Sequence, residues 1–336
     1  MPAASIGRKF MRKLVSTLSL GALLLAGTIG LAGKASAEDW PNRKTITAVF
    51  PFAAGSDYIA RIVMGAVEKE IGQRILIDNR PGAGGAIGTG YAARQPADGY
   101  TFVFAYPGPA ANFTNTFAGL PYKPLEDFEY VSGISKATMV IVARTGLPFT
   151  DFKGMIEYAK ANPGKLSVSN SGIGTYGHMV ELAFSDLAGI KMKMVPYKGN
   201  SEVVTDMLSG SLDMSMDFLN NNYMKQIEAG TIRPLAIVSA ERAADLPNVP
   251  TFKESGIDLV AQPWAGLMAP KGTPPSVIER MNKAVVNYLN TDEAKQAFAK
   301  IGQQVNPTTP KEFRDVVVSE EVKWRDLIAK YEIKNQ

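Results

Sequence analysis

Two kinds of hydrophobic spacing alternate along this chain from about residue 45 onward. Short apolar runs, such as 45–52 and 101–106, predict buried β-strands, whereas apolar residues three and four positions apart predict helices. In the segment 57–71 one such helical face is formed by Ile59, Ile62, Val63, Ala66, Val67 and Ile71. Strands that alternate with helices are typical of parallel α/β sheets, so the pattern predicts an α/β protein.

The same alternation continues in a second block that begins with a strand at 139–143. Further strands are expected at 74–78, 166–169, 191–195, 213–217, 235–238 and 264–269, and helices at 151–161, 176–188, 201–208 and 221–229. Three helices close the chain. The last begins at Thr309-Pro310-Lys311-Glu312, which combines an N-cap, a proline in the first turn and a capping-box acid.

The length of 336 residues suggests two domains, yet no linker or internal repeat divides the sequence. Two α/β lobes between which the chain crosses more than once would explain this. We predict that residues 38–138 plus 262–336 form lobe 1 and residues 139–261 form lobe 2, each a mainly parallel sheet flanked by helices.

The first 37 residues have the three parts of a secretory signal peptide. A basic cluster at 8–13 precedes an apolar stretch at 14–31, and Ala35-Ser36-Ala37 supplies the small residues before a cleavage site. The alternative is a membrane anchor, but serine, threonine and glycine dilute the apolar stretch. Cleavage after Ala37 is expected, and the start could be Met1 or Met11.

Loss of this leader changes what the charge implies. The full chain has a net charge of +4 and a pI near 9, which suggests nucleic acid or anionic membrane as a partner. Residues 1–37 contain five basic and no acidic residues, so the remaining 299 residues carry a charge of −1. We therefore expect a periplasmic monomer that binds no nucleic acid.

The reactive side chains are few. Because there is no cysteine and only one histidine, disulfides, Cys-ligated zinc and His-rich metal sites are excluded, and no cofactor is expected. The glycine run 82–88 does not have the G-x-G-x-x-G spacing of a dinucleotide site, and no phosphate-binding P-loop or G-x-S-x-G motif occurs. A Ser-His-Asp mechanism would have to use His178, for which a structural role is the better interpretation.

Several predicted strands instead end in polar, glycine-rich loops that run directly into a helix. These loops are 52–57, 169–175 and 197–201. Free backbone N–H groups and the positive end of the helix dipole make such loops suitable for anions, although the same residues also serve simply as helix caps. Ligands of open α/β sheets bind at the carboxyl ends of strands, so two lobes could hold one carboxylate between such loops.

Seven motifs in order along the chain resemble one known family, the Bug-type solute-binding proteins of tripartite tricarboxylate transporters. They are PFAAGSDYIAR (51–61), DNRPGAGGAIG (78–88), PADGYTFVF (96–104), SNSGIGTYGH (169–178), VPYKGN (195–200), ADLPNVPTFKESG (244–256) and APKGTPPSVIERMN (269–282). The resemblance implies two lobes that close like a clamshell on a small carboxylate. It also implies delivery of that ligand to the membrane subunits of the transporter.

The resemblance also implies a set of ligand-binding residues. They are Gly55, Ser56 and Asp57 in the first-lobe loop, Ser171, Gly172, Gly174, Thr175 and His178 in the second-lobe loop, Tyr197, Gly199 and Asn200 in the next loop, and the strand-end Asp217. To these we add the aromatic residues Phe52 and Tyr106 as candidates from their own chemistry. The first loop is two residues shorter than the family pattern PFAPGGxxDxxAR. Thr175 stands where the family usually has serine.

The identity of the carboxylate stays open. Six aromatic residues are candidates for the mouth of the site: Phe52, Tyr58, Tyr106, Phe113, Tyr176 and Phe218. They slightly favour an aromatic mono- or dicarboxylate, which could stack on them, but a short aliphatic acid is equally compatible with the loops. Two other functions also stay open: a ligand-sensing accessory of a membrane signalling protein, and a periplasmic hydrolase that depends on His178.

Overall fold

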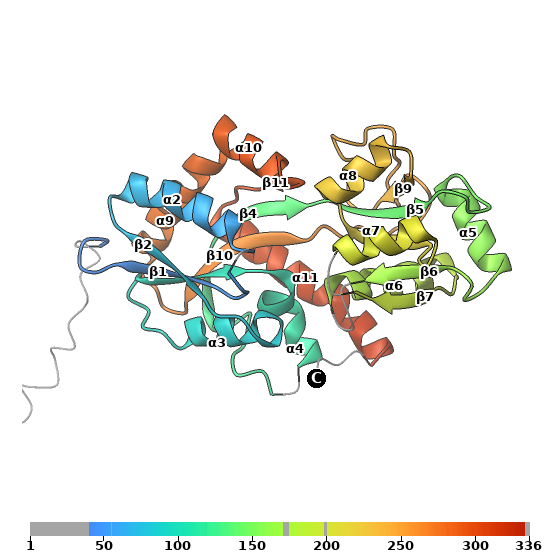
Figure 1. Ribbon diagram of the computed structural model, residues 1–336. Helices are drawn as coiled ribbons and strands as arrows, with labels where there is room; N and C mark the ends of the chain where they lie inside the picture. Colours follow the sequence, from blue (N-terminus) through green and yellow to red (C-terminus); the bar gives the residue numbers. More distant parts are fainter. Residues whose placement is uncertain (1–39, 55, 118, 171–174, 198–199, 333–336) are drawn as a thin grey trace, which may run out of the picture. The chain divides into compact units, whose positions relative to one another are not determined.

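The computed structural model describes residues 40–54, 56–117, 119–170, 175–197 and 200–332 (Figure 1). The predicted signal peptide and five predicted site residues, Gly55, Ser171, Gly172, Gly174 and Gly199, lie outside these ranges. One compact unit extends from Pro41 to the end of the chain, and the following description concerns this unit. Within the described residues, no helix is both long enough and apolar enough to cross a membrane.

The first sheet has six strands in the order β11-β4-β10-β3-β1-β2. These strands are β1 (Ile46–Phe50), β2 (Ile75–Asn79), β3 (Thr101–Ala105), β4 (Phe128–Ala137), β10 (Trp264–Pro270) and β11 (Gln303–Val305).

The second sheet has five strands in the order β7-β6-β8-β5-β9. These strands are β5 (Met139–Arg144), β6 (Ser167–Asn170), β7 (Lys193–Pro196), β8 (Met214–Phe218) and β9 (Ile232–Ile237). The chain therefore passes from the first sheet to the second between β4 and β5 and returns between β9 and β10. Figure 1 shows β4 and β5 following one another in nearly the same direction.

The helices lie between the strands, as the hydrophobic spacing predicts. They are α2 (Tyr58–Ile71), α3 (Ala86–Ala93), α4 (Phe113–Thr116), α5 (Phe152–Ala161), α6 (Tyr176–Ala188), α7 (Asn200–Ser209), α8 (Asn221–Glu228), α9 (Pro275–Leu289), α10 (Asp292–Ala299) and α11 (Pro310–Lys330). A short 3-10 turn at Ala83–Gly85 and a π-helical turn at Gly108–Asn112 complete the elements. The capping box predicted at Thr309 and Glu312 is confirmed.

The α/β class is confirmed, but the prediction of mainly parallel sheets is wrong. In the first sheet β1 pairs in parallel with β2 and β3, whereas β10 runs antiparallel to both β3 and β4, and β11 runs antiparallel to β4. In the second sheet β6 is parallel to β7 and β8, and β5 is antiparallel to β8 and β9. The alternation of strands and helices predicts parallel strands only while the chain stays within one sheet. A strand that follows a crossover enters its sheet from the opposite end and runs antiparallel to its neighbours.

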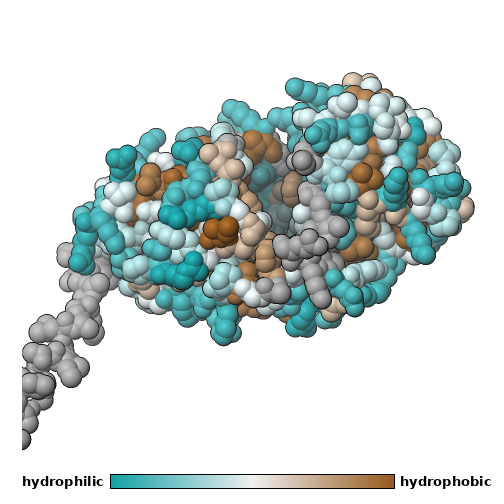
Figure 2. Space-filling view, turned by 60° about the horizontal axis from the view of Figure 1, so that its bottom comes forward, coloured by the Kyte–Doolittle hydropathy of each residue, from teal (hydrophilic) through white to brown (hydrophobic). Residues whose placement is uncertain are grey.

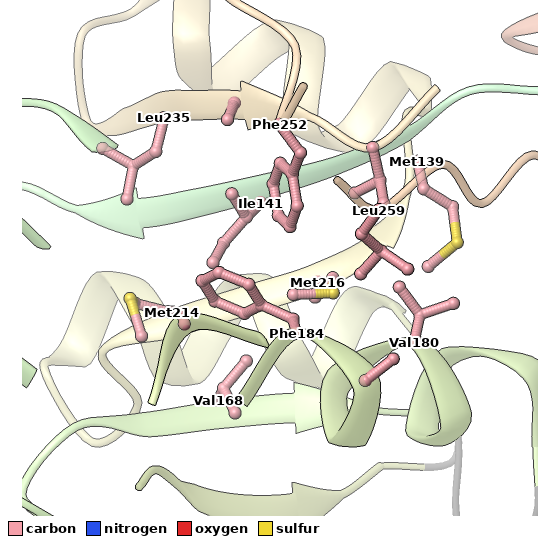
Figure 3. Packing of buried hydrophobic residues seen from close by; sticks show 14 of the residues in the cluster. Met139, Ile141, Val168, Val180, Phe184, Met214, Met216, Leu235, Phe252 and Leu259 are labelled. Atoms are coloured by element: carbon pink, nitrogen blue, oxygen red, sulfur yellow. The ribbon is translucent and has the colours of Figure 1, made fainter. Parts of the chain in front are cut away.

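The strand β5 shows why its residues form an uninterrupted apolar run. Its odd-numbered members Met139, Ile141 and Ala143 join one buried cluster, which also contains Phe184 and Phe252 (Figure 3). Its even-numbered members Val140 and Val142 join a second cluster on the opposite face of the sheet. Successive side chains of a strand point to opposite faces, so a strand covered on both sides must be apolar at every position.

The long helix α11 contributes to the hydrophobic cores of both sheets. Near its start, Phe313 and Val317 pack in the cluster that covers the first sheet. One to two turns before its end, Trp324 and Ile328 pack in the cluster of the second sheet, where Trp324 makes an edge contact with Tyr176 at 5.6 Å between ring centroids. This helix therefore ties the two sheets together in addition to the two strand crossovers.

Candidate functional site

A cavity of about 360 Å³ lies between residues of the two sheets. It is lined by Tyr106, Ser135, Ala137, Asn200, Asp217, Phe218, Leu219, Asn220, Pro263, Trp264, Ala265, Ile301, Gly302 and Gln303. Three of these, Tyr106, Asn200 and Asp217, are predicted site residues, and Tyr106 lies about a hundred positions before the other two in the sequence. Figure 2 shows that the surface of the unit is hollowed in the middle of one face, with apolar and polar side chains around the hollow.

The wall supplied by the first sheet is mainly aromatic. Tyr106 follows the last residue of β3, and its ring lies 5.0 Å from that of Phe52 and 6.0 Å from that of Phe50, in edge-on arrangements. Such edge-to-face pairs add rigidity to the packing. Burial raises the pKa of the Tyr106 hydroxyl above its usual range, so this side chain remains a neutral hydrogen-bonding group at physiological pH.

Trp264, the first residue of β10, is the second aromatic member of this wall. Its side chain is 4% exposed, and its ring packs edge-on against Phe313 at 5.4 Å. Its indole Nε1–H is buried and has no hydrogen-bond acceptor among the described residues. Neither Trp264 nor Ser135 was predicted as a site residue, because nothing in the sequence shows which residues of a central strand face a cavity.

The first-lobe loop places Asp57 just before helix α2. The residue is 3% exposed, and its carboxylate accepts a hydrogen bond at 2.7 Å from the guanidinium of Arg61, one turn later in the helix. Asp57 is therefore neutralised by an ion pair and is not among the residues that line the cavity. Ser56 donates its hydroxyl proton to the carbonyl of Ala53, which closes this short loop on itself.

The wall supplied by the second sheet contains the only ionisable side chain other than Tyr106 among the described lining residues. Asp217 lies near the carboxyl end of β8, and its Oδ1 accepts a hydrogen bond of 2.7 Å from the backbone N–H of Phe218. Burial raises the pKa of Asp217, while the Phe218 amide and the nearby Asn200 side chain oppose that shift. The carboxyl group is thus held in a place that disfavours its charge.

A second carboxyl group, that of Glu181, lies deeper in the same half and was not predicted. Glu181 is fully buried on α6 and accepts a hydrogen bond of 2.7 Å from the side chain of Asn170, the last residue of β6. Its other oxygen has no partner among the described residues. Burial raises the pKa of Glu181 well above its ordinary value, and the charge of Asp217 raises it further. The position is hard to find from sequence because a glutamate on a helix usually faces solvent.

A chain of hydroxyl groups continues this buried polar region beneath the cavity. The Ser169 hydroxyl donates to Ser215 at 2.7 Å, and the Ser215 and Tyr223 oxygens lie 2.6 Å apart. These groups connect β6, β8 and α8 through side chains that satisfy one another. They hold the strand ends that carry Asn170 and Asp217 in a fixed position.

The predicted residues at the start of α6 cap the helix. Thr175 is the N-cap, and its hydroxyl accepts from the backbone N–H of His178 at 3.4 Å. Burial lowers the pKa of the His178 imidazole, so this side chain is mostly neutral at physiological pH. Neither residue is among those that line the cavity.

Most of the remaining predicted residues lie outside the lining of the cavity. The hydroxyl of Tyr197 donates to Asp206 at 2.6 Å, and both residues border a separate surface hollow with Ser201, Glu202 and Thr205. Of the six aromatic candidates, Tyr106 and Phe218 line the cavity and Phe52 packs on Tyr106. Tyr58 points to the surface, Phe113 is buried against Phe117, and Tyr176 packs on Trp324.

A metal centre finds no support in the part of the chain that the structure describes. No group of three or more His, Asp or Glu side chains there comes close enough to hold an ion. The chemistry available at the cavity is therefore hydrogen bonding and aromatic contact.

Two α/β halves with a cavity between their strand ends have the fold of a solute-binding receptor. Residues 59–333 match the family described as the tripartite tricarboxylate transporter family receptor, and the chain belongs to this family. It is 32% identical over 309 residues to Protein BugT of Bordetella pertussis, and this match covers 91% of this chain and 94% of that protein.

Solved structures of related proteins agree with this assignment. An R. palustris protein with adipate is 31% identical, with a TM-score of 0.74, and the match covers 88% of this chain and 99% of that chain. The protein MatC from Rhodopseudomonas palustris with bound malate is 27% identical, with a TM-score of 0.70, over 85% of this chain and 99% of that chain. The predicted family is therefore confirmed.

Proposed function

We propose that this protein is a periplasmic receptor that binds one small organic carboxylate between its two halves and delivers it to the membrane subunits of a tripartite tricarboxylate transporter. The observation that carries the proposal is the cavity to which both sheets contribute, with Tyr106 on one side and Asn200 and Asp217 on the other. Related proteins with adipate and with malate support a carboxylate as the ligand class.

The proposed site includes the residues that the family resemblance implies. Backbone N–H groups at the starts of α2, α6 and α7 would face the carboxylate group, because helix N-termini favour anions. The cavity between the two sheets would receive the rest of the ligand. In this arrangement the loops recognise the charge, and the lining residues of the cavity recognise the shape and the second end of the ligand.

The proposed setting of the protein follows from its leader. Cleavage after Ala37 would release a nearly neutral chain, which fits a periplasmic monomer that binds no nucleic acid. Residues 38–138 plus 262–336 would form one lobe and residues 139–261 the other, with the hinge at the two strand crossovers. No catalytic role is proposed for His178, since it is not among the residues that line the cavity.

A thermal-shift screen of the purified mature chain tests this function. The panel contains aliphatic and aromatic carboxylates, and neutral sugars and metal cations serve as negative controls. At about a hundred times its Kd, a true ligand stabilises the folded state by about 2.7 kcal/mol. Stabilisation by a carboxylate and not by the controls is the expected result. Stabilisation by sugars or cations alone would overturn the proposal.

Two variants locate the site in the same assay. Asn200→Ala removes a lining side chain and is expected to weaken binding, since the cavity loses a polar group. Tyr197→Phe is the comparison variant: it keeps the ring of this proposed site residue and removes only the hydroxyl, which is already paired with Asp206, so binding should be retained. If Tyr197→Phe abolished binding while Asn200→Ala did not, the ligand would lie in the surface hollow and not in the cavity.

Lobe closure has its own measurement. Small-angle scattering of the saturated protein is expected to give a smaller radius of gyration than the ligand-free protein. An unchanged radius would show that the two halves, joined by α11 as well as by the strand crossovers, do not move on binding.

A further inference from the structure

A direct contact joins the two halves of the molecule beside the cavity, in addition to the strand crossovers and α11. It lies between the turn after α10, residues 300–302, and the turn between β8 and α8, residues 219–220 (Figure 1). The side-chain amide of Asn221 in α8 donates a hydrogen bond of 3.1 Å to the carbonyl of Lys300. Both turns supply lining residues, so this contact forms part of one wall of the cavity.

The turn after α10 has no room for a side chain at Gly302. A Cβ atom there would come within 3.0 Å of the carbonyl oxygen of Leu219, a distance below which real Cβ atoms essentially never occur. The obstacle is a backbone atom of the other half and cannot rotate away as a flexible side chain could. The present separation of the two halves therefore requires glycine at position 302.

Each turn is anchored by hydrogen bonds of its own. The N–H of Leu219 donates to the carbonyl of Thr138 at 2.8 Å, and Asn220 caps α8 by accepting from two backbone N–H groups at the start of that helix. In the other half, the N–H of Gly302 donates to the carbonyl of Ala299 at 3.0 Å, and β11 pairs with β4 directly afterwards. A side chain at position 302 would thus be accommodated by separating the halves and not by reshaping either turn.

We propose that this contact belongs to the closed arrangement in which the cavity holds its ligand, and that Gly302 is a positioning residue that allows the halves to reach this arrangement. The inference rests on the proposed function and specifies what limits closure. Gly302 acts through the separation of the halves and needs no contact with the ligand. Because a ligand binds the closed fraction of the protein, its apparent Kd rises as that fraction falls.

The variants Gly302→Ala and Gly230→Ala form a matched pair. Both glycines follow the end of a helix, have φ values of 70° and 69°, and donate their N–H to the carbonyl three residues earlier at 3.0 Å. An alanine therefore meets the same backbone strain at both positions. At Gly230 no atom lies within 4 Å of the added Cβ, so only Gly302→Ala presses on the other half.

The separation of the halves is measured by electron paramagnetic resonance between spin labels on Lys225→Cys in α8 and Lys295→Cys in α10. Both positions are exposed, and the chain has no cysteine of its own, so only these two sites are labelled. The measurement is made without solute and with adipate, malate or benzoate. Gly230→Ala is expected to show a short-distance population that an acid increases, and Gly302→Ala is expected to lose it.

Calorimetric titration with the same three acids gives the effect on binding. For each acid that binds, the Kd of Gly302→Ala is expected to be at least about tenfold higher than that of Gly230→Ala, as a tenfold smaller closed fraction requires. A second variant, Asn221→Ala, removes the hydrogen bond between the halves without adding bulk and should raise the Kd about threefold. Its control is Asn222→Ala, the next exposed residue of α8. This pair keeps the test decisive if Gly302→Ala does not fold.

The outcomes separate the two proposals. Equal distance distributions or equal Kd values for Gly302→Ala and Gly230→Ala would overturn this inference and leave the carboxylate receptor intact. If no carboxylate bound the original protein and a neutral sugar did, the proposed function would fall. The distance difference between the two variants without solute would then decide the role of the contact by itself.

Discussion

The two halves of the molecule on either side of the cavity hold their buried acidic residues in opposite ways. On the side of the first sheet, Asp57 is buried but paired with Arg61 at 2.7 Å. On the side of the second sheet, Glu181 and Asp217 are held without a basic partner among the described residues, and burial raises the pKa of both. The buried acid of the first half is therefore paired with a cation, whereas burial favours the protonated form of both carboxyl groups in the second half.

This difference suggests that the two halves contribute differently to ligand binding. The Asp57–Arg61 ion pair fixes the loop before α2 whether or not a ligand is bound. The aromatic wall supplied by the first sheet is therefore formed before binding. In the second half a polar network holds the buried acids in place and offsets part of the cost of burying them. It consists of Asn170, Ser169, Ser215 and Tyr223. Buried titratable groups without counter-ions are common at functional sites, which is consistent with ligand discrimination on this side.

The largest effect is expected from a change in helix α11, which packs in the hydrophobic cores of both sheets. Trp324→Ala removes a fully buried side chain of α11 from the core of the second sheet and should lower the free energy of unfolding by about 3–5 kcal/mol. Chemical denaturation measures this loss. Val322→Ala, on the exposed side of the same helix, is the control and should change stability by less than about 0.5 kcal/mol. Equal effects of the two variants would contradict the assignment of α11 to the core.

A smaller effect is expected from removing the cation of the first half. Arg61→Gln leaves the buried Asp57 carboxylate without its ion-pair partner and should destabilise the protein by about 1–2 kcal/mol, a value reduced because Arg61 itself is mostly exposed. Combining it with Asp57→Asn should recover most of this loss, since no buried charge remains. If the loss were the same with and without Asp57→Asn, the two side chains would not be coupled.

The smallest effect concerns the second half and depends on pH. Because burial raises the pKa of Glu181, the native state holds this proton more tightly than the unfolded state. The stability from this group is therefore complete below the ordinary value of 4.5 and is lost as the pH rises through the native pKa. Glu181→Gln should remove that loss and gain about 1 kcal/mol at neutral pH.

Asp186, an exposed acid on the same helix, is expected to change the stability with pH in the opposite direction. Lys330 lowers the pKa of the exposed Asp186, so the stability that this group contributes is present at neutral pH and is lost as the pH falls. Unfolding curves of Glu181→Gln and Asp186→Asn across the acidic to neutral range should therefore diverge in opposite directions from the original protein. A flat difference for Glu181→Gln would mean that its carboxyl group is not shifted by burial.

The sequence allowed most elements to be predicted because helical and strand spacing survive in their apolar residues. Four elements, α3, α4, β4 and β11, were missed, two of them for identifiable reasons. Strand β4 contains the buried Ser132 and Ser135 and a glycine, Gly133, at which a Cβ atom would come within 2.7 Å of the Asn306 carbonyl. Its small polar residues therefore hide a strand that is buried over most of its length.

Helix α3 was hidden in the glycine run by a similar requirement. A Cβ atom at Gly88 would lie 2.7 Å from the Arg80 carbonyl and 2.9 Å from the Pro51 Cα, so close packing and not phosphate binding requires glycine there. Gly85, the N-cap of α3, has a left-handed φ of 100°. These glycines are needed for packing and turn geometry in a run that is glycine-rich but lacks the spacing of a nucleotide motif.

The candidate site was only partly predictable. The family resemblance indicated Asn200 and Asp217, and the aromatic candidates included Tyr106; the fold brings all three to one cavity. Trp264 and Glu181 could not be found in this way, because their burial depends on strand direction and on helix packing that local spacing does not encode. Strand direction was also the error in the predicted sheets.

The most direct test of the account is a crystal structure of the mature protein with the carboxylate that stabilises it most. We expect the ligand in the cavity between the two sheets, with one end in contact with Asp217 or Asn200 and its carboxylate at the helix starts. A ligand bound only at the surface hollow beside Tyr197 and Asp206, or on one half of the molecule alone, would contradict the account.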